Sequence, residues 1–257
     1  MPHFPPSTPL TPHQHALIIG ASSGIGAALA RRLAQENYRL ALIARRADRL
    51  QALCEELNQP EPRAIFYAHD VTHYDKVPSL LERVISDLGG LDVVMYVAGL
   101  NEPPGGLDRY DFEKDRRMIE VNLLGAMAWL DAVAPLFQQA GRGHIVGISS
   151  VAGERGRVGN PGYGASKAAL TSYLESLRNR LTRYGVHVLT VKPGFVQTDM
   201  LKAAQKVIFP ISPERAAEDI FQALKTRKQE IYTPWFWRYI MLLIRNIPSP
   251  LFRRMTI

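Results

Sequence analysis

Residues 15–35 read HALIIGASSGIGAALARRLAQ, an apolar run followed by a glycine turn and a helix-forming stretch. The run predicts a buried strand, and the turn places Gly20, Gly24 and Gly26 in a G-x-x-x-G-x-G spacing. Such glycines let the backbone approach a pyrophosphate, and the following helix presents free N–H groups to it. Tight strand–helix packing could also explain the turn, but its place between strand and helix near the chain start favours cofactor binding. The predicted contacts are Gly20, Ser22, Ser23, Gly24, Ile25 and Gly26.

Apolar runs and helix-forming stretches alternate along the rest of the chain. Five further strands are predicted at 39–44, 64–68, 91–97, 144–149 and 186–191. Because the alternation contains no internal repeat, we expect an α/β fold, a single-domain, Rossmann-like, doubly wound parallel sheet. The expected organisation is a disordered N-terminal arm at 1–14, a folded domain at 15–233 and a C-terminal extension at 234–257.

The end of the second strand bears on the choice of nicotinamide cofactor. An NAD site usually carries an acidic residue there, about 20 residues after the glycine turn, to bind the ribose hydroxyls. This chain has Arg45 and Arg46 instead. A guanidinium can pair with the 2′-phosphate of NADP, whereas a solvated basic start to the next helix is the alternative. We expect NADPH or NADP, with NAD as the alternative, and Arg45 as the better candidate.

Other predicted cofactor contacts follow the ends of later strands, where ligands bind in open parallel sheets. Asp70 follows the third strand and can either bind the adenine amine or cap the next helix. The remaining candidates follow the third, fourth and sixth strands: Val71, Ala98, Gly99, Pro193, Gly194, Val196 and Thr198.

Residues 149–167, SSVAGERGRVGNPGYGASK, contain the candidate catalytic groups. Tyr163 and Lys167 are four apart, so a helix would place both on one face. A solvated Tyr–Lys pair has the same spacing, and only an upstream dinucleotide site favours catalysis. An unperturbed phenol has a pKa of about 10, which a neighbouring ammonium and a bound, positively charged nicotinamide would lower. Tyr163 could then exchange a proton with a carbonyl oxygen, to which Ser150 offers a second hydrogen bond.

Asn122 and the loop after Ser150 supply further candidates. Asn122 lies in the apolar run EVNLLGAM and is either a helix-distorting structural residue or part of a proton relay. Glu154, Arg155 and Arg157 should lie on the substrate side, where arginines could hold a phosphate or sugar hydroxyls. A solvated loop is the alternative for Arg157.

Length, charge and cysteine content limit the class of protein. A chain of 257 residues can bury a sizeable α/β core, and the single cysteine excludes an intrachain disulfide and a Cys-rich metal site. The N-terminal arm has five prolines and no apolar run, so it predicts neither a signal peptide nor a membrane span. We expect a cytoplasmic protein. Residues 201–257 hold ten Lys and Arg against four Asp and Glu, or +6 of the total net charge of +7. This clustering argues against nucleic-acid binding.

The basic C-terminal extension is also apolar and aromatic. Residues 235–247 are apolar apart from Arg238, Arg245 and Asn246, and are too short for a helix of about 20 residues to span a bilayer. Trp, Tyr and Arg around a short apolar segment suit an interfacial helix on anionic lipid. A cover for the domain's own core or an oligomer interface is the alternative. The local charge favours peripheral contact with the cytoplasmic face of a membrane.

In this order and spacing, GASSGIG, Asp70, Asn122, Ser150, YGASK and PGFVQT resemble the short-chain dehydrogenase/reductase family over residues 15–233. The resemblance implies a Rossmann sheet that binds NAD(P)(H), a catalytic Asn122–Ser150–Tyr163–Lys167 group, and homodimers or homotetramers. Two positions depart from the family pattern, Ile19 in place of a common Thr and Val97 in place of a common Asn. The second removes a polar contact between central strands and leaves the catalytic group intact.

The sequences SSVAGERGR and WFWRYIMLLIRNIPSPLFRRMTI are similar to one subgroup of this family. These are the reductases of decaprenyl-phosphoryl 2-keto-pentose, which act with a flavoenzyme in making an arabinose donor. The resemblance implies a lipid-linked keto-sugar as substrate. Arg45 points to NADPH, whereas we would expect NADH in that pathway.

We therefore expect an NADPH-dependent reductase of a small-molecule or lipid-linked ketone, with Tyr163 as proton donor and no metal. One alternative is a reductase of 3-oxoacyl or other hydrophobic ketones that uses the C-terminal extension as a lid. Another is a catalytically silent dinucleotide-binding scaffold, against which the intact Ser–Tyr–Lys set argues.

Overall fold

The computed structural model describes residues 14–203 and 207–255 of the chain. Its sheet has seven strands, all parallel, in the order β3-β2-β1-β4-β5-β6-β7. The expected α/β, doubly wound fold is confirmed. The predicted N-terminal arm lies outside the described residues except for Gln14. The strands are β1 (His15–Ile19), β2 (Arg39–Ala44), β3 (Ala64–Ala68), β4 (Val93–Tyr96), β5 (His144–Ile148), β6 (His187–Pro193) and β7 (Glu230–Thr233).

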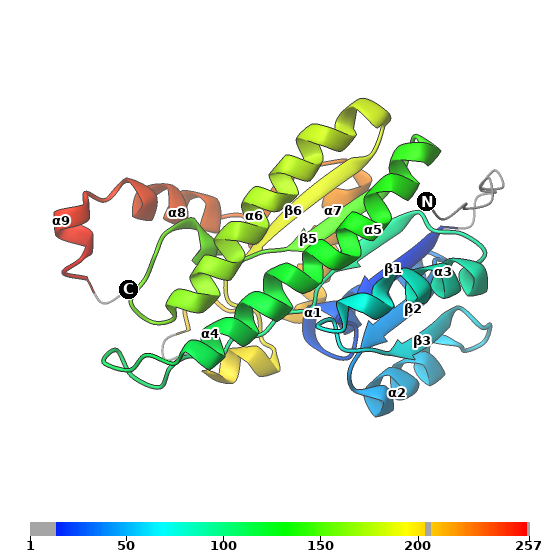
Figure 1. Ribbon diagram of the computed structural model, residues 1–257, viewed down its shortest axis with the longest axis horizontal. Coiled ribbons are helices and arrows are strands. Elements are labelled where there is room, and N and C mark those ends of the chain that lie inside the picture. The colour runs from blue at the N-terminus through cyan, green and yellow to red at the C-terminus, as the bar shows by residue number, and fades with distance from the viewer. Residues whose placement is uncertain (1–13, 204–206, 256–257) are drawn as a thin grey trace.

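Helices cover both faces of the sheet, as Figure 1 shows. On one face lie α1 (Gly24–Gln35), α2 (Ala47–Leu57) and α7 (Pro213–Lys225). On the other lie α3 (Val77–Leu88), α5 (Gly125–Ala140) and α6 (Pro161–Leu181). Successive residues of β1 point to opposite faces, so Ile18 packs against the first layer and Ile19 against the second. Both faces are buried, which explains why this strand is a continuous apolar run.

One long helical stretch runs lengthwise over one face of the sheet (Figure 1). It consists of α4 (Phe112–Ile119), a π-helical turn (Glu120–Leu124) and α5. The whole stretch, Phe112–Ala140, is long and apolar enough to span a bilayer by length and composition. In the structure Trp129, Val133 and Phe137 are buried in the core against the sheet. Core packing therefore accounts for these three residues, whereas only a third of the apolar window is buried.

The seventh strand was not predicted. β7 pairs with β6 in parallel register and has a short, four-residue ladder. Of its four residues only Thr233 is buried, while Ile231 and Tyr232 are half-buried and Glu230 is exposed. The segment therefore lacks the continuous apolar run that marks the central strands. The sheet therefore extends to the end of the predicted domain at residue 233.

The C-terminal extension folds back against the domain. After β7 come α8 (Trp237–Asn246) and α9 (Ser249–Phe252). Both lie at the end of the molecule toward which the C-terminal ends of the strands point (Figure 1). Trp237 and Met241 are buried and pack against Val151, in the loop after the candidate serine. The inner face of α8 thus covers the domain's own core, one of the two roles expected for this segment.

Candidate active site

A cavity of about 680 Å³ opens at the C-terminal ends of the central strands. Its volume lies within the range of about 300–1,000 Å³ that is usual for small-molecule sites. The glycine turn, both arginines after β2 and the loops after β3, β4, β5 and β6 all contribute to its wall. Residues far apart in the chain therefore meet because parallel strands end at one edge.

The glycine turn at residues 20–26 packs so closely against neighbouring backbone that Gly20 and Gly26 have no room for a side chain. Gly20 has a φ of +98°, and a Cβ at this position would lie 2.7 Å from the Ala98 Cα. A Cβ at Gly26 would collide with the carbonyl of Gly20. Ser23 is the N-cap residue of α1, but its side chain makes no capping hydrogen bond. The first N–H groups of the helix are therefore not bonded by an N-cap side chain. This cradle fits a pyrophosphate on a helix N-terminus.

Arg46 lies against the same turn. Its Nη2 donates to Ser22 Oγ at 2.8 Å and to Ser23 Oγ at 2.7 Å. Arg45 is more exposed and its Nη1 lies 3.8 Å from Asp70 Oδ2. Both arginines line the cavity. The structure thus places Arg46, rather than the expected Arg45, beside the serines of the turn, and sequence spacing could not separate two adjacent arginines.

Asp70 caps its own loop. Its Oδ1 accepts from the Thr72 N–H at 3.0 Å and from the Thr72 hydroxyl at 2.9 Å. Asp70 does not cap the following helical turn (Tyr74–Lys76), whose N-cap residue is His73, so the capping alternative is not met and the adenine role stays a prediction. Asp70 and Val71 also line the cavity, as do Ala98, Gly99, Pro193, Gly194, Val196 and Thr198.

Ser150 and Tyr163 both lie in the cavity wall. Ser150 follows β5, and Tyr163 lies in the first turn of α6, where Asn160 Oδ1 accepts from the Tyr163 N–H at 3.3 Å. Burial raises the pKa of Tyr163, and its hydrogen bond with Ser150 lowers the pKa by less. The expectation of a lowered tyrosine pKa is therefore not met by the protein's own groups. An ordinary phenol is already protonated at neutral pH, so a raised pKa makes Tyr163 a weaker proton donor.

Lys167 lies one helical turn after the tyrosine. Its Nζ donates to the Ile148 carbonyl at 2.9 Å and lies 5.9 Å from the centre of the Tyr163 ring. Burial lowers the pKa of Lys167 to about 8. A lysine with this pKa changes its charge in a range where enzymes work. The four-residue spacing therefore brings the two side chains to one face of α6, as expected.

Asn122 is buried in the π-helical turn, a feature often found at functional sites. Its Oδ1 accepts from the Leu100 N–H at 2.7 Å, and its Nδ2 donates to the Leu100 carbonyl and to Ser166 Oγ, both at 2.9 Å. These bonds hold the loop after β4 beside α6. The role seen here is the structural one. Its part in a proton relay stays a prediction.

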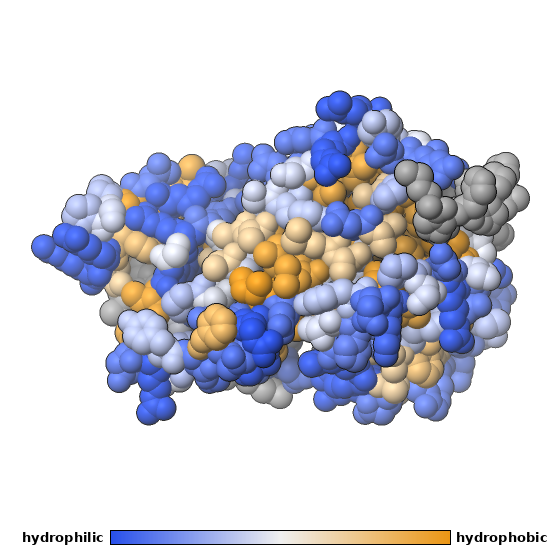
Figure 2. Space-filling view, in the orientation of Figure 1, coloured by the Kyte–Doolittle hydropathy of each residue, from blue (hydrophilic) through white to orange (hydrophobic). Residues whose placement is uncertain are grey.

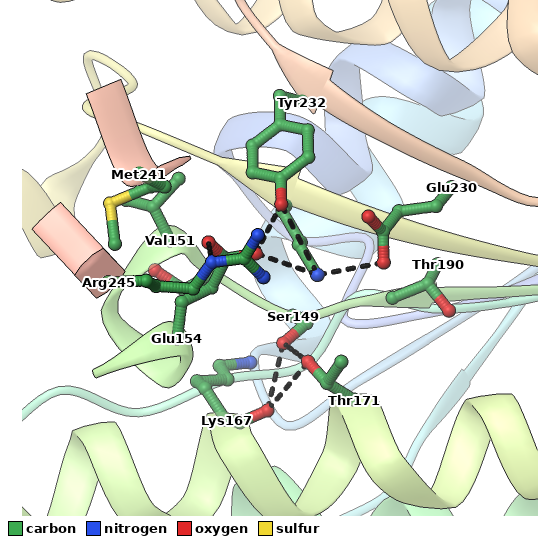
Figure 3. Close-up of polar contacts among 12 residues, drawn as sticks. Ser149, Val151, Glu154, Lys167, Thr171, Thr190, Glu230, Tyr232, Met241 and Arg245 are labelled. Carbon is green, nitrogen blue, oxygen red and sulfur yellow. Dashed lines mark hydrogen bonds and ion pairs between the residues drawn. The ribbon is translucent and has the colours of Figure 1, made fainter. Parts of the chain in front are cut away.

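Two serines that sequence reasoning did not single out support the site. Ser149 Oγ donates to the Lys167 carbonyl at 2.9 Å and lies 2.6 Å from Thr171 Oγ1 (Figure 3). Ser166 accepts from Asn122 and donates to the Tyr163 carbonyl at 2.8 Å. Both tie α6 to its neighbours. The only sequence signal was their adjacency to Ser150 and Lys167.

The three expected substrate residues have different positions. Glu154 is outside the cavity wall and almost fully buried, with Oε1 bonded to Lys192 Nζ at 2.7 Å and to the Tyr232 hydroxyl (Figure 3). Arg155 is also outside it, bonded to the carbonyls of Ile244 and Arg245. Both positions correct the expectation, because internal partners occupy these side chains. Only Arg157 lines the cavity.

Comparison with known sequences gives consistent results. Residues 14–207 match the family model described as short chain dehydrogenase. An uncharacterized oxidoreductase of Myxococcus xanthus is 36% identical over 242 residues, which cover 93% of this chain and 95% of the relative. The ketoacyl reductase HetN of Nostoc is 30% identical over 220 residues, 84% of this chain and 76% of the relative.

Two solved structures share the fold. A variant of the actinorhodin polyketide ketoreductase with NADPH has a TM-score of 0.74 and 27% identity, covering 82% of this chain and 89% of its own. ElxO with NADP bound has a TM-score of 0.77 and covers 87% of this chain and 99% of its own. Its 21% identity supports the likeness in fold alone.

Proposed function

The chain belongs to the short-chain dehydrogenase family, and from this membership we propose that it is an NADPH-dependent reductase of ketones. The observation that carries the proposal is a single cavity lined by the glycine turn, Ser150, Tyr163 and Lys167. A cofactor site and an acid catalyst thus share one space. The ketoacyl reductase HetN and the actinorhodin ketoreductase, both similar to this chain, support ketone reduction.

The turn at residues 20–26 fits the pyrophosphate of a dinucleotide, because it has an open cradle and the N-terminus of α1. Arg46 and Arg45 would bind a 2′-phosphate, which favours NADP(H) over NAD(H). Asp70 remains available to the adenine through its second carboxylate oxygen. Lys167 would hold the nicotinamide ribose, with Val196 and Thr198 on the carboxamide and phosphate.

The nicotinamide, when bound, supplies a hydride to the carbonyl carbon of the substrate. Tyr163 donates its hydroxyl proton to the carbonyl oxygen, and Ser150 donates a hydrogen bond to the same oxygen. The Lys167 ammonium would lower the pKa of Tyr163, which burial raises, toward the range that an acid catalyst needs. Lys167 stabilises the phenolate left behind, and Asn122 holds a water for proton return.

The substrate class is a hydrophobic or lipid-linked ketone. Apolar residues that include Leu100, Val151 and Phe195 line the cavity that holds Ser150. The resemblance of the loop after Ser150 and of the C-terminal extension to decaprenyl-phosphoryl 2-keto-pentose reductases favours a polyprenyl-phosphoryl keto-sugar. A 3-oxoacyl or other hydrophobic ketone is the second candidate, favoured by the similarity to HetN.

Exposed apolar side chains gather at the end of the molecule where the cavity opens. Of the fourteen large apolar residues exposed in the described parts of the chain, twelve lie at 107–112, 158, 207–209 and 235–251. Figure 1 shows α8, α9 and the loop before α4 at this end. Trp235 and Tyr239 accompany Arg238 and Arg253, a composition that suits an anionic membrane surface. We propose a cytoplasmic protein in peripheral contact with the membrane through this end.

A second apolar surface suits self-association. Leu124, Ala128, Ala132 and Leu136 recur every four residues and are partly exposed. Figure 2 shows the apolar band that crosses this side of the molecule over α5 and α6. We propose that a homodimer or homotetramer forms through this band.

Cofactor oxidation by the purified protein tests the proposal, with NADPH against NADH and with or without a polyprenyl-phosphate lipid extract. Oxidation of NADPH that depends on the extract supports a lipid-linked ketone. Loss of the NADPH preference in Arg46→Ala supports the 2′-phosphate assignment. If neither nucleotide binds, the reductase assignment is wrong and a silent scaffold remains. Sedimentation with phosphatidylglycerol vesicles and the mass in solution test the two surfaces.

A further inference from the structure

Arg157 has a guanidinium in the cavity wall with few partners. Its Nη2 lies 3.4 Å from the Val151 carbonyl and 3.2 Å from Met241 Sδ, both weak contacts. Its Nε is buried without a hydrogen-bond partner. No carboxylate of the described residues lies within 4.0 Å of this guanidinium. A shielded cation of this kind normally has an anion beside it.

The acidic residue nearest in the chain has other partners. Glu154 Oε1 accepts from Lys192 Nζ and from the Tyr232 hydroxyl, while the same Nζ lies 2.7 Å from Glu230 Oε2 (Figure 3). Glu154 Oε2 faces Arg245, at 3.9 Å from its Nε. Burial lowers the pKa of Arg157. The distant charge of Glu154 raises this pKa by a smaller amount. The network keeps its carboxylate away from the cavity.

The neighbouring arginine shows what a satisfied guanidinium looks like on the same loop. Arg155 bonds to two carbonyls at the end of α8, and its guanidinium stacks 3.8 Å above the Phe252 ring of α9. It anchors the C-terminal extension. Arg157, two residues later, contacts α8 only through Met241 and faces the cavity instead.

We propose that Arg157 forms an anion subsite for the substrate, so that the enzyme prefers ketones that carry a carboxylate or a phosphate ester. This inference rests on the proposed reductase function and names the substrate class of the same site. The chemistry fits because a guanidinium forks onto either anion with two hydrogen bonds. Apolar residues that line the same cavity, among them Val151 and Phe195, would take the alkyl part of the molecule.

The anion is assigned to the substrate and not to the cofactor by position. Arg157 lies on the loop that follows Ser150 and contacts α8, whereas the phosphate cradle is the turn at 20–26 with Arg46 beside it. The reacting pair Ser150 and Tyr163 lies on the segments that flank Arg157 in the chain. An anionic group bound to Arg157 would therefore hold the substrate with its carbonyl group toward Ser150 and Tyr163.

The test compares three ketones of matched chain with NADPH, namely 4-oxodecanoate, 4-oxodecyl phosphate and methyl 4-oxodecanoate. We expect wild-type kcat/KM to favour at least one of the anionic ketones at least tenfold, mainly through KM, and the better anion identifies the group. Arg157→Gln should abolish this preference, so that its kcat/KM for the anionic ketones falls to its value for the ester. Arg157→Lys should retain part of it, and Arg142→Gln, a distant exposed arginine, should match wild type.

An unchanged preference in Arg157→Gln overturns the inference, as does weaker NADPH binding in that variant. Folding is checked by NADPH affinity and thermal unfolding of each variant. Failure of wild type to reduce any of the ketones counts against the proposed function, and calorimetric titration of decanoate into the NADP-loaded protein then tests the subsite separately. Decanoate binding that is lost in Arg157→Gln supports it, and no binding to wild type contradicts it.

Discussion

Ser149 donates a hydrogen bond from its Oγ to the main-chain carbonyl of Lys167, at 2.9 Å. The residue before Ser150, the proposed catalytic serine, therefore holds the helical turn that carries Lys167. Thr171 Oγ1, one turn further along α6, lies 2.6 Å from the same hydroxyl (Figure 3). The end of β5 and the start of α6 are thus fixed to each other, which sets the position of Ser150 relative to Tyr163 and Lys167.

Replacing Ser149 by alanine should weaken this attachment. The carbonyl of Lys167 and the hydroxyl of Thr171 would each lose a buried partner, so we expect the free energy of unfolding to fall by about 1–3 kcal/mol. We also expect kcat to fall severalfold with little change in NADPH affinity. Urea unfolding and steady-state kinetics measure the two effects, with the exposed Ser79→Ala as control. A kcat equal to that of wild type would show that this tie does not position the catalytic groups.

The rate of ketone reduction should fall at high pH. Burial lowers the pKa of Lys167 to about 8, so the ammonium that faces Tyr163 loses its charge above this pH. We expect kcat/KM to decline above pH about 8, and Lys167→Arg, which stays charged, to remove the decline. Stability should change in the opposite sense, because the folded pKa lies below the ordinary lysine value. The free energy of unfolding should rise between about pH 8 and 10.5. A pH profile unaltered in Lys167→Arg would assign the decline to another group.

A buried histidine pair should make the fold sensitive to acid. The Nδ1 atoms of His144 and His187 lie 3.1 Å apart, and His187 Nε2 lies 2.8 Å from the Lys228 carbonyl. Burial first, and then the neighbouring His187 and Arg227, lower the pKa of His144 from 6.5 to about 4. Protonation therefore favours the unfolded chain, and stability is complete above pH 6.5 and is lost as the pH falls toward 4.

From pH 7 to pH 5 this pair should cost about 2 kcal/mol of unfolding free energy. Chemical denaturation at both pH values measures it, with His144→Gln as the matched comparison. The variant should lose less stability than wild type over this interval. Equal losses in the two proteins would mean that other groups cause the acid sensitivity.

Removing the carboxylate of Glu154 should destabilise the fold more than removing an exposed one. Glu154→Gln removes one of the two carboxylates bonded to the almost fully buried Lys192, whose Nζ keeps Glu230 Oε2 at 2.7 Å. We therefore expect a cost of about 1–3 kcal/mol, below the value for a buried charge left without any partner. The exposed ion pair between Arg31 and Glu56 provides the control. Its disruption by Glu56→Gln should cost less than about 1 kcal/mol. Thermal or denaturant unfolding compares the two, and similar small losses would contradict the structural role of Glu154.

Most of the sheet could be predicted from the sequence because its strands are continuous apolar runs. The bounds of β1, β2 and β3 agree with the predicted ranges, whereas β7 was missed because it is short, lies at the edge and follows charged residues. The sequence also predicted that the glycine turn and the Ser–Tyr–Lys set lie close together, because the C-terminal ends of parallel strands meet at one side of a sheet. In the structure they line one cavity.

The internal chemistry of the site could not be predicted in the same way. Lys192 lies in the apolar run of β6, but its partner Glu154 is 38 residues earlier, and only the fold brings them together. The direction of the Tyr163 pKa depends on burial, which the spacing of Tyr163 and Lys167 does not report. The different partners of Arg45 and Arg46 likewise depend on the direction in which each side chain points after β2, which the sequence does not report.

The measurement that tests the central claim most directly is NADPH oxidation by Tyr163→Phe and wild type, with a ketone that the wild type reduces. Phenylalanine keeps the ring and removes only the hydroxyl that donates the proton. We predict that reduction falls at least a thousandfold while NADPH binds the variant with nearly unchanged affinity. Reduction by Tyr163→Phe at a rate close to that of wild type would contradict the assignment of Tyr163 as the acid.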